Sequence, residues 1–119
     1  MFYNEGMKRV YLADARPIER SDLRLLLVDR DMQVVGEAAG WSSVLNHGPT
    51  THPDVVVVDW SLISARSVAA MKELRVAYPK AVLVVVPGQM DAHQRSMLIA
   101  GTDEFSREYY QSKRLAKQL

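Results

Sequence analysis

The chain has 119 residues, enough for one domain that buries about two thirds of its unfolded surface. Fifteen basic and fourteen acidic residues leave a net charge of +1, so we expect no global field that attracts nucleic acid or anionic lipid. The lack of cysteine excludes disulfides and thiolate metal sites, and no apolar run is as long as a membrane span or a signal-peptide core. These properties predict a cytoplasmic protein that recognises its partners locally.

Strands and helices alternate along the chain. In chain order we predict a strand over 8–13, a helix over 16–28, a strand over 33–39, a short helix over 41–47, a strand over 54–59, a helix over 67–78, a strand over 81–86, a helix over 91–100, a weak strand over 103–106 and an amphipathic tail. Five strands interleaved with five helices predict an α/β fold with a doubly wound parallel sheet. We assign residues 8–119 to this one domain and residues 1–7 to an N-terminal extension.

The segment PDVVVVDW, residues 53–60, is typical of a strand buried on both faces, and it ends on the carboxylate of Asp59. Asp14 ends the first strand in the same way. Because neighbouring parallel strands end at one edge of the sheet, we expect both carboxylates to open into one crevice, where acids hold a hard cation or accept a group. The alternative is that each aspartate caps a following helix, which is the weaker interpretation for Asp59 because no helical pattern follows it at once.

Other functional motifs are scarce. His47 and His52 flank a Gly-Pro-Thr-Thr stretch and, without cysteine or a clustered third ligand, are interpreted as loop residues rather than zinc ligands. No glycine-rich nucleotide loop or nucleophile elbow is present in the sequence. A small enzyme that uses Asp14 and Asp59 as acid and base remains an alternative, but we predict no enzymatic activity.

Several segments together resemble the receiver domain of bacterial two-component response regulators, in particular the branch with a helix-turn-helix output domain. They are ADARP after the first strand, RSDLRLLL in the first helix, VVGEAA in the second strand, PDVVVVD before Asp59, LRVAYP closing the third helix, and AG at 100 and 101. The likeness covers nearly the whole chain from Lys8. It implies a flavodoxin-like fold with strand order 2-1-3-4-5.

The resemblance also implies a site. In that family the residue in the place of Asp59 accepts a phosphoryl group, and acids at the end of the first strand bind Mg²⁺. In this chain the paired acids are Asp14 and Ala15, so one metal ligand is missing. Mg²⁺ binding by Asp14 and Asp59 is therefore expected to be weak or absent, and a cofactor is expected only if Asp59 is phosphorylated.

Other positions of the pocket depart from the family as well. Alignment forward from Asp59 places Pro87 at the position of the family's hydroxyl, and alignment backward from Gly101 places Val86 there. Neither side chain donates a hydrogen bond. Phe105 takes the place of the switch aromatic. Glu108 falls where the family has a lysine, although a slip of one residue brings Arg107 there instead.

These departures predict a degenerate receiver, or pseudo-receiver, because the charge added at Asp59 lacks the cations that normally offset it. We hypothesise that the guanidinium of Arg16 or of Arg66 pairs with Asp59 in place of the metal. The alternative is a solvated surface arginine, which contributes little.

The function favoured by the resemblance is a phosphorylation-independent interaction module. It would bind a protein partner or a second copy through the fourth helix, fifth strand and fifth helix. The alternative is a genuine phospho-acceptor that a histidine kinase modifies and that controls a DNA-binding output domain absent from this chain. We expect no membrane contact and no direct nucleic-acid binding by the chain alone.

Overall fold

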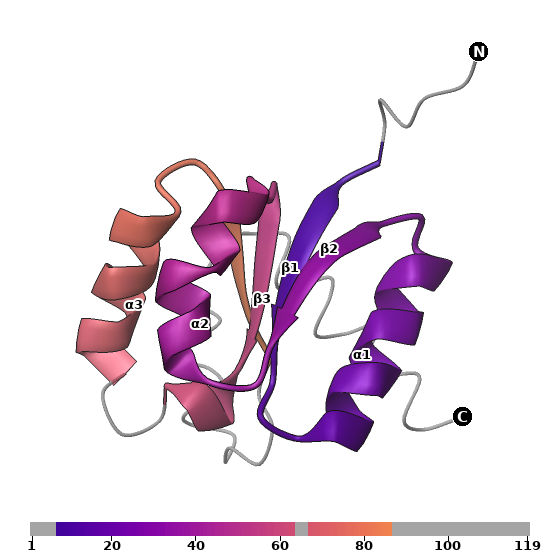
Figure 1. Cartoon of the computed structure of the whole chain (residues 1–119), viewed down its shortest axis with the longest axis horizontal. Coiled ribbons are helices and arrows are strands. Elements are labelled where there is room, and N and C mark those ends of the chain that lie inside the picture. The colour runs from indigo at the N-terminus through magenta and orange to yellow at the C-terminus, as the bar shows by residue number, and fades with distance from the viewer. Residues whose placement is uncertain (1–6, 64–66, 87–119) are drawn as a thin grey trace.

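Four parallel strands form a sheet in the order β2-β1-β3-β4 (Figure 1). The computed structural model describes residues 7–63 and 67–86. The elements in these ranges are β1 (Arg9–Ala13), α1 (Pro17–Asp29), β2 (Gln33–Ala38), α2 (Trp41–Asn46), the 3-10 turn η1 (Gly48–Thr51), β3 (Val55–Asp59), the 3-10 turn η2 (Trp60–Leu62), α3 (Ser67–Ala77) and β4 (Val82–Val86).

Helices cover both faces of this sheet, with α1 on one side and with α2 and α3 on the other (Figure 1). Alternate residues of each strand point to opposite faces, so the valine runs divide between two cores. On one face Leu23 and Leu27 of α1, one helical turn apart, pack against β1, β3 and β4. On the other face Val44 of α2 and Leu74 of α3 pack against the remaining strand residues. The predicted α/β architecture with a parallel sheet is confirmed.

The central pair of strands positions the acidic crevice. β1 pairs with β3 in parallel, Ala13 opposite Val58, so Asp14 and Asp59 come to the same edge of the sheet. From β1 the chain turns to β2 on one side and later returns to β3 on the other, which makes the carboxyl edge between β1 and β3 a topological switch point. Open α/β sheets bind ligands at such a point.

Short 3-10 turns are the main local difference from the sequence prediction. The expectation that no helical element directly follows Asp59 is wrong, because η2 begins at Trp60 and the Asp59 side chain caps it by accepting a hydrogen bond from the backbone N–H of Ser61. A three-residue turn is too short to show a helical period. Trp60 is half-buried and packs against the core on the α2 and α3 face.

The prediction of a fifth strand over 103–106 and of helices over 91–100 and in the tail lies outside the described residues. The described part contains four strands and three α-helices and follows the 2-1-3-4 portion of the expected strand order. Among the residues described, no helix is both long enough and apolar enough to span a bilayer.

Candidate functional site

Asp59 lies at the end of β3 and is fully buried. Its Oδ2 atom accepts hydrogen bonds from the backbone N–H of Ser61 at 3.0 Å and from the Ser61 hydroxyl at 2.6 Å. Its Oδ1 atom accepts a hydrogen bond from the Arg16 guanidinium at 3.2 Å. Both oxygens of the carboxylate are therefore engaged by donors, and these contacts compensate for its loss of water.

Asp14 follows β1 and is likewise fully buried. Its Oδ1 atom accepts from the backbone N–H of Arg16 at 2.9 Å, whereas its Oδ2 atom has no hydrogen-bond partner among the described residues. The N-cap of α1 is Arg16, so Asp14 closes a turn before the helix rather than capping it. Burial raises the pKa of Asp14, and the nearby charge of Asp59 raises it further, against the lowering effect of Arg16.

Arg16 joins the two aspartates. Its Nη2 atom lies 3.2 Å from Asp59 Oδ1, its Nε atom lies 3.6 Å from Asp14 Oδ1, and it also forms an ion pair with Glu19, one turn further along α1. Partial desolvation acts to lower the pKa of Arg16, but Asp59, Glu19 and Asp14 together raise it above its ordinary value. The ion pair between Arg16 and Asp59, one of the two pairings that the sequence suggested, is present in the structure.

Glu19 is a site residue that sequence reasoning missed. One oxygen of each of Asp14, Glu19 and Asp59 lies within 4.8 Å of the others, so Glu19 joins the two aspartates as a carboxylate that the sequence did not indicate. The signal available in the sequence is the spacing of three residues between Arg16 and Glu19, because side chains so spaced are neighbours on a helix. Ser61, two residues after Asp59, was also missed, although aspartate commonly accepts a hydrogen bond from the backbone two residues on.

A second arginine lies behind this cluster. Arg20 donates from Nη1 to the backbone carbonyl of Asp14 at 2.8 Å and pairs through Nε with Glu37 of β2 at 3.1 Å. The two contacts tie the turn after β1 to α1 and β2. This anchoring holds Asp14 in place without adding a free positive charge to the crevice, since Arg20 is already paired.

The substituted positions of the pocket are only partly described. Ala15 is exposed, and Val86 is buried at the end of β4, opposite Asp59 in the sheet register and in the core cluster on the α1 face. Its side chain offers no donor to Asp59. The remaining predicted site residues lie outside the described residues: Arg66, Pro87, Phe105, Arg107 and Glu108.

The donor set of the crevice suits a hard divalent cation, because it consists of carboxylate oxygens and includes the unpartnered Oδ2 atom of Asp14. A guanidinium already lies among these oxygens, however, and two cations in one cluster repel each other. The residues therefore fit Mg²⁺ only when Arg16 has moved away from Asp59.

Comparisons with known proteins agree with this geometry. The chain is 30% identical over 84 residues to the uncharacterized transcriptional regulatory protein YxjL of Bacillus subtilis (strain 168), a match that covers 70% of this chain and 38% of that protein. A LuxR-family two-component response regulator from Aurantimonas sp. SI85-9A1 has a similar structure, with a TM-score of 0.65 and 28% identity over 82% of this chain and 71% of that one. No protein-family model matches the chain.

A further structural neighbour shows the same fold at lower identity. The isolated REC domain of RcsB from Salmonella enterica serovar Typhimurium, determined in the presence of phosphomimetic BeF3-, matches with a TM-score of 0.68 and 20% identity over 80% of this chain and 72% of that chain. A parallel sheet of this strand order, with a buried aspartate at the end of β3, is the architecture of receiver domains. The chain is a receiver domain of the response-regulator class. Within that class it is similar to receivers of LuxR-family regulators.

Proposed function

We propose that this receiver domain is degenerate and acts as a phosphorylation-independent, non-enzymatic interaction module in two-component signalling in the cytoplasm. One observation supports this proposal above the others: the guanidinium of Arg16 pairs with Oδ1 of Asp59, 3.2 Å away. A cation built into the chain then takes the place that a metal occupies in a working receiver. The site would remain in one state instead of switching.

Charge balance gives the physical reason. Phosphorylation of Asp59 adds negative charge beside Asp14 and Glu19, and it needs cations that stabilise the transferring group. The acid expected at position 15 is an alanine, so the metal would have one ligand fewer from this loop. If each lost electrostatic contact resembles a lost oxyanion donor, it costs about 3 kcal/mol of transition-state stabilisation.

Mg²⁺, if bound, would be held by Asp14 and Asp59, with Glu19 as a third carboxylate. It would neutralise negative charge on an incoming phosphoryl group. The chain's own residues then have separate tasks: Ser61 orients the Asp59 carboxylate through Oδ2, and Arg16 competes with the metal for Oδ1.

The test is incubation with Mg²⁺ and acetyl phosphate, followed by mass spectrometry of the intact protein. We expect no product heavier by about 80 daltons, the mass of one phosphoryl group. Asp59→Asn serves as the blank, and Arg16→Ala shows whether removal of the guanidinium restores any acceptor activity. Rapid, Mg²⁺-dependent modification of the unmodified sequence at Asp59 would show that the domain is a working switch.

The second candidate function is a genuine phospho-acceptor that controls a DNA-binding output domain. It is favoured by the retention of a buried aspartate at the end of β3 with two further carboxylates beside it. The chain spans 38% of the length of the transcriptional regulatory protein that it matches, which leaves room in that protein for an output domain. The same acetyl phosphate experiment separates the two functions.

The partner surface also belongs to the proposal. By resemblance to receivers, a protein partner or a second copy of the chain would bind at the fourth helix, fifth strand and fifth helix, and a histidine kinase would be an additional partner under the second function. These segments, including Phe105, lie outside the described residues. Size-exclusion chromatography over a range of concentrations tests self-association.

A further inference from the structure

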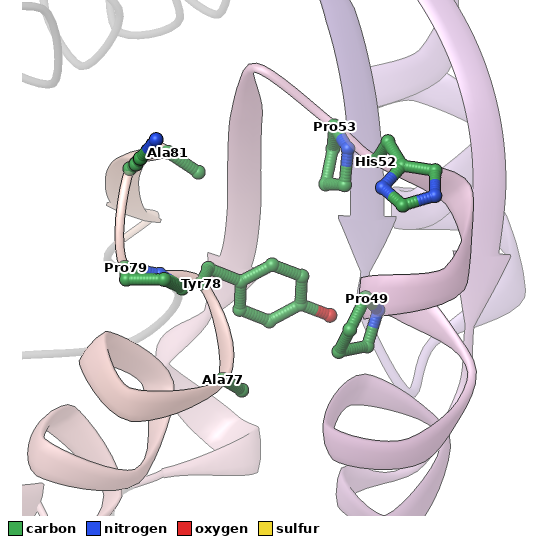
Figure 2. A pocket seen from close by; sticks show the side chains of 8 residues that line it. Pro49, His52, Pro53, Ala77, Tyr78, Pro79 and Ala81 are labelled. Atoms are coloured by element: carbon green, nitrogen blue, oxygen red, sulfur yellow. The ribbon is translucent and has the colours of Figure 1, made fainter.

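A second recess lies at the opposite edge of the sheet from the acidic crevice. It is a cavity of about 320 Å³ between the segment 49–53, which leads into β3, and the segment 77–81, which leads from α3 into β4. Figure 2 shows Tyr78 between these two segments, with its hydroxyl directed toward Pro49. A volume of this size is at the lower end of the range for small-molecule pockets.

Stiff apolar side chains form one part of the cavity wall. Three prolines, Pro49, Pro53 and Pro79, line the cavity together with the small side chains of Ala77 and Ala81. Proline has a fixed φ angle and no backbone N–H, so these three residues offer a rigid surface without a backbone donor. The Tyr78 hydroxyl is occupied, because it donates to the backbone carbonyl of Val44. The proline and alanine part of the wall therefore suits an apolar body.

The charge that the described lining residues place at the rim is positive. Lys80 and His52 line the cavity and are exposed, and no carboxylate is among the described residues that line it. The nearest acid in the sequence, Asp54, has its Oδ2 atom turned to the backbone N–H of Arg9 at 2.9 Å. A ligand that carries one negative charge would thus meet an ammonium at the rim without facing a competing carboxylate among these lining residues.

The rim is also held in place by contacts from β1. The Arg9 guanidinium donates to the carbonyl of Thr51 at 2.6 Å and to the carbonyl of His52 at 3.3 Å. His52 itself has a left-handed backbone with φ 51 and ψ 57, a conformation that costs about 1 kcal/mol or more for a residue with a side chain. Such strain persists where the surroundings hold it, and here it places the imidazole at the rim beside Pro53 (Figure 2).

We propose that this pocket binds a small organic monoanion, with an apolar body against the prolines and Tyr78 and a carboxylate at Lys80 and His52. Phosphate is the poorer occupant, because its several acceptor oxygens need a cluster of donors that proline walls do not supply. The proposal concerns a site separate from Asp59 and goes beyond the proposed function, so either can fail without the other.

The probe is benzoate, added to the full-length ¹⁵N-labelled chain and followed by amide chemical shifts, with benzyl alcohol as an uncharged analogue of similar shape. We expect saturable shifts at His52, Ala77 and Ala81 with a dissociation constant of about 1 mM, as is usual for so small a ligand. Binding of benzyl alcohol should be at least about fivefold weaker, because it lacks the charge-assisted contact.

Two variants and one control test the assignment of residues. Lys80→Gln should weaken benzoate binding at least about threefold through loss of the charged contact, and Ala77→Leu should abolish binding by filling the cavity. Lys72→Gln, an exposed change on α3 that is outside this pocket, should leave binding unchanged. If Ala77→Leu does not fold, the exposed Lys80→Gln substitution still decides the question.

Three results would overturn the proposal. They are the absence of saturable shifts at about 20 mM benzoate, far above the affinity expected for this pocket, equal binding of benzyl alcohol and benzoate, and unchanged affinity in Lys80→Gln.

Discussion

At Arg16 a single guanidinium lies among three carboxylates, two of them fully buried. Removing one partner of a buried ion pair usually costs more than the pair contributes, because the other charge is left uncompensated. The Arg16 side chain is 40% exposed, so water screens part of this interaction. We therefore expect the loss of stability on removing the Arg16 side chain to lie between the losses typical of surface ion pairs and of buried ion pairs.

We therefore predict that Arg16→Ala lowers the free energy of unfolding by about 1–2 kcal/mol, as measured by urea denaturation. The matched control is Arg24→Ala on the same helix, whose pair with Glu37 spans 3.7 Å with both side chains partly exposed. That control should change stability by no more than about 0.5 kcal/mol. Equal effects of the two substitutions would contradict the importance of the Arg16 contacts.

Asp14 gives a prediction for pH dependence. Because burial raises its pKa in the folded state, the folded chain binds a proton more tightly than the unfolded chain does. The contribution of Asp14 to stability is then fully present below the unfolded pKa, near 3.8, and is lost as pH rises through the raised folded pKa.

Asp14→Asn should reduce this fall in stability, because the amide does not titrate. Urea midpoints across a pH series measure the slope. Asp22→Asn, which removes an exposed carboxylate from α1, is the control and should leave the slope near that of the unsubstituted chain. A slope that is the same in Asp14→Asn as in the unsubstituted chain would argue against a shifted Asp14.

Among the elements, η1 is held by close packing of two tyrosines beneath it. The hydroxyl of Tyr11 in β1 lies 3.1 Å from His47 Nδ1. The hydroxyl of Tyr78 donates to the backbone carbonyl of Val44. A Cβ atom on Gly48 would clash with the Tyr78 hydroxyl and would lie 2.9 Å from the Tyr11 ring. Glycine is needed here for space rather than for an unusual backbone angle.

Gly48→Ala should therefore destabilise the chain by about 1–3 kcal/mol, the usual cost of overpacking a core, in thermal or urea denaturation. Gly40→Ala is the control, because its added methyl group meets nothing within 4 Å. Since Gly40 is the N-cap of α2, a smaller loss of a few tenths of a kcal/mol is expected there. A larger effect at Gly40 than at Gly48 would contradict the packing argument.

The same elements show how far sequence patterns reach. The valine run predicted β3 as a fully buried strand, and the helix predicted over 16–28 agrees with α1 within one residue at each end. The 3-10 turns η1 and η2 were not predicted, since four and three residues carry no period. Both turns hold residues that shape the two sites, namely Pro49 and Ser61.

For the whole molecule, the acidic crevice makes a prediction about metal linkage. A ligand that binds only the folded state stabilises it by an amount that grows with the logarithm of one plus the ratio of its concentration to its dissociation constant. A cation that cannot displace Arg16 therefore leaves the melting temperature unchanged. We expect about 10 mM Mg²⁺ to have no effect on the unsubstituted chain and to raise the melting temperature of Arg16→Ala by a few degrees. Trp60 fluorescence, next to Asp59, provides a second readout. A Mg²⁺ response of the unsubstituted chain equal to that of Arg16→Ala would contradict competition at this site.

The sequence by itself determined the alternation of strands and helices, the burial of β3, and the meeting of Asp14 and Asp59 at one edge, because these follow from local periodicity and from the rules of parallel sheets. Tertiary structure alone decided which side chains complete each site. Glu19 joins the aspartates, Arg16 reaches Asp59 across 43 positions of the chain, and segments 49–53 and 77–81 enclose a pocket. Contacts between distant segments depend on how the packed elements direct each side chain, and no local pattern contains that information.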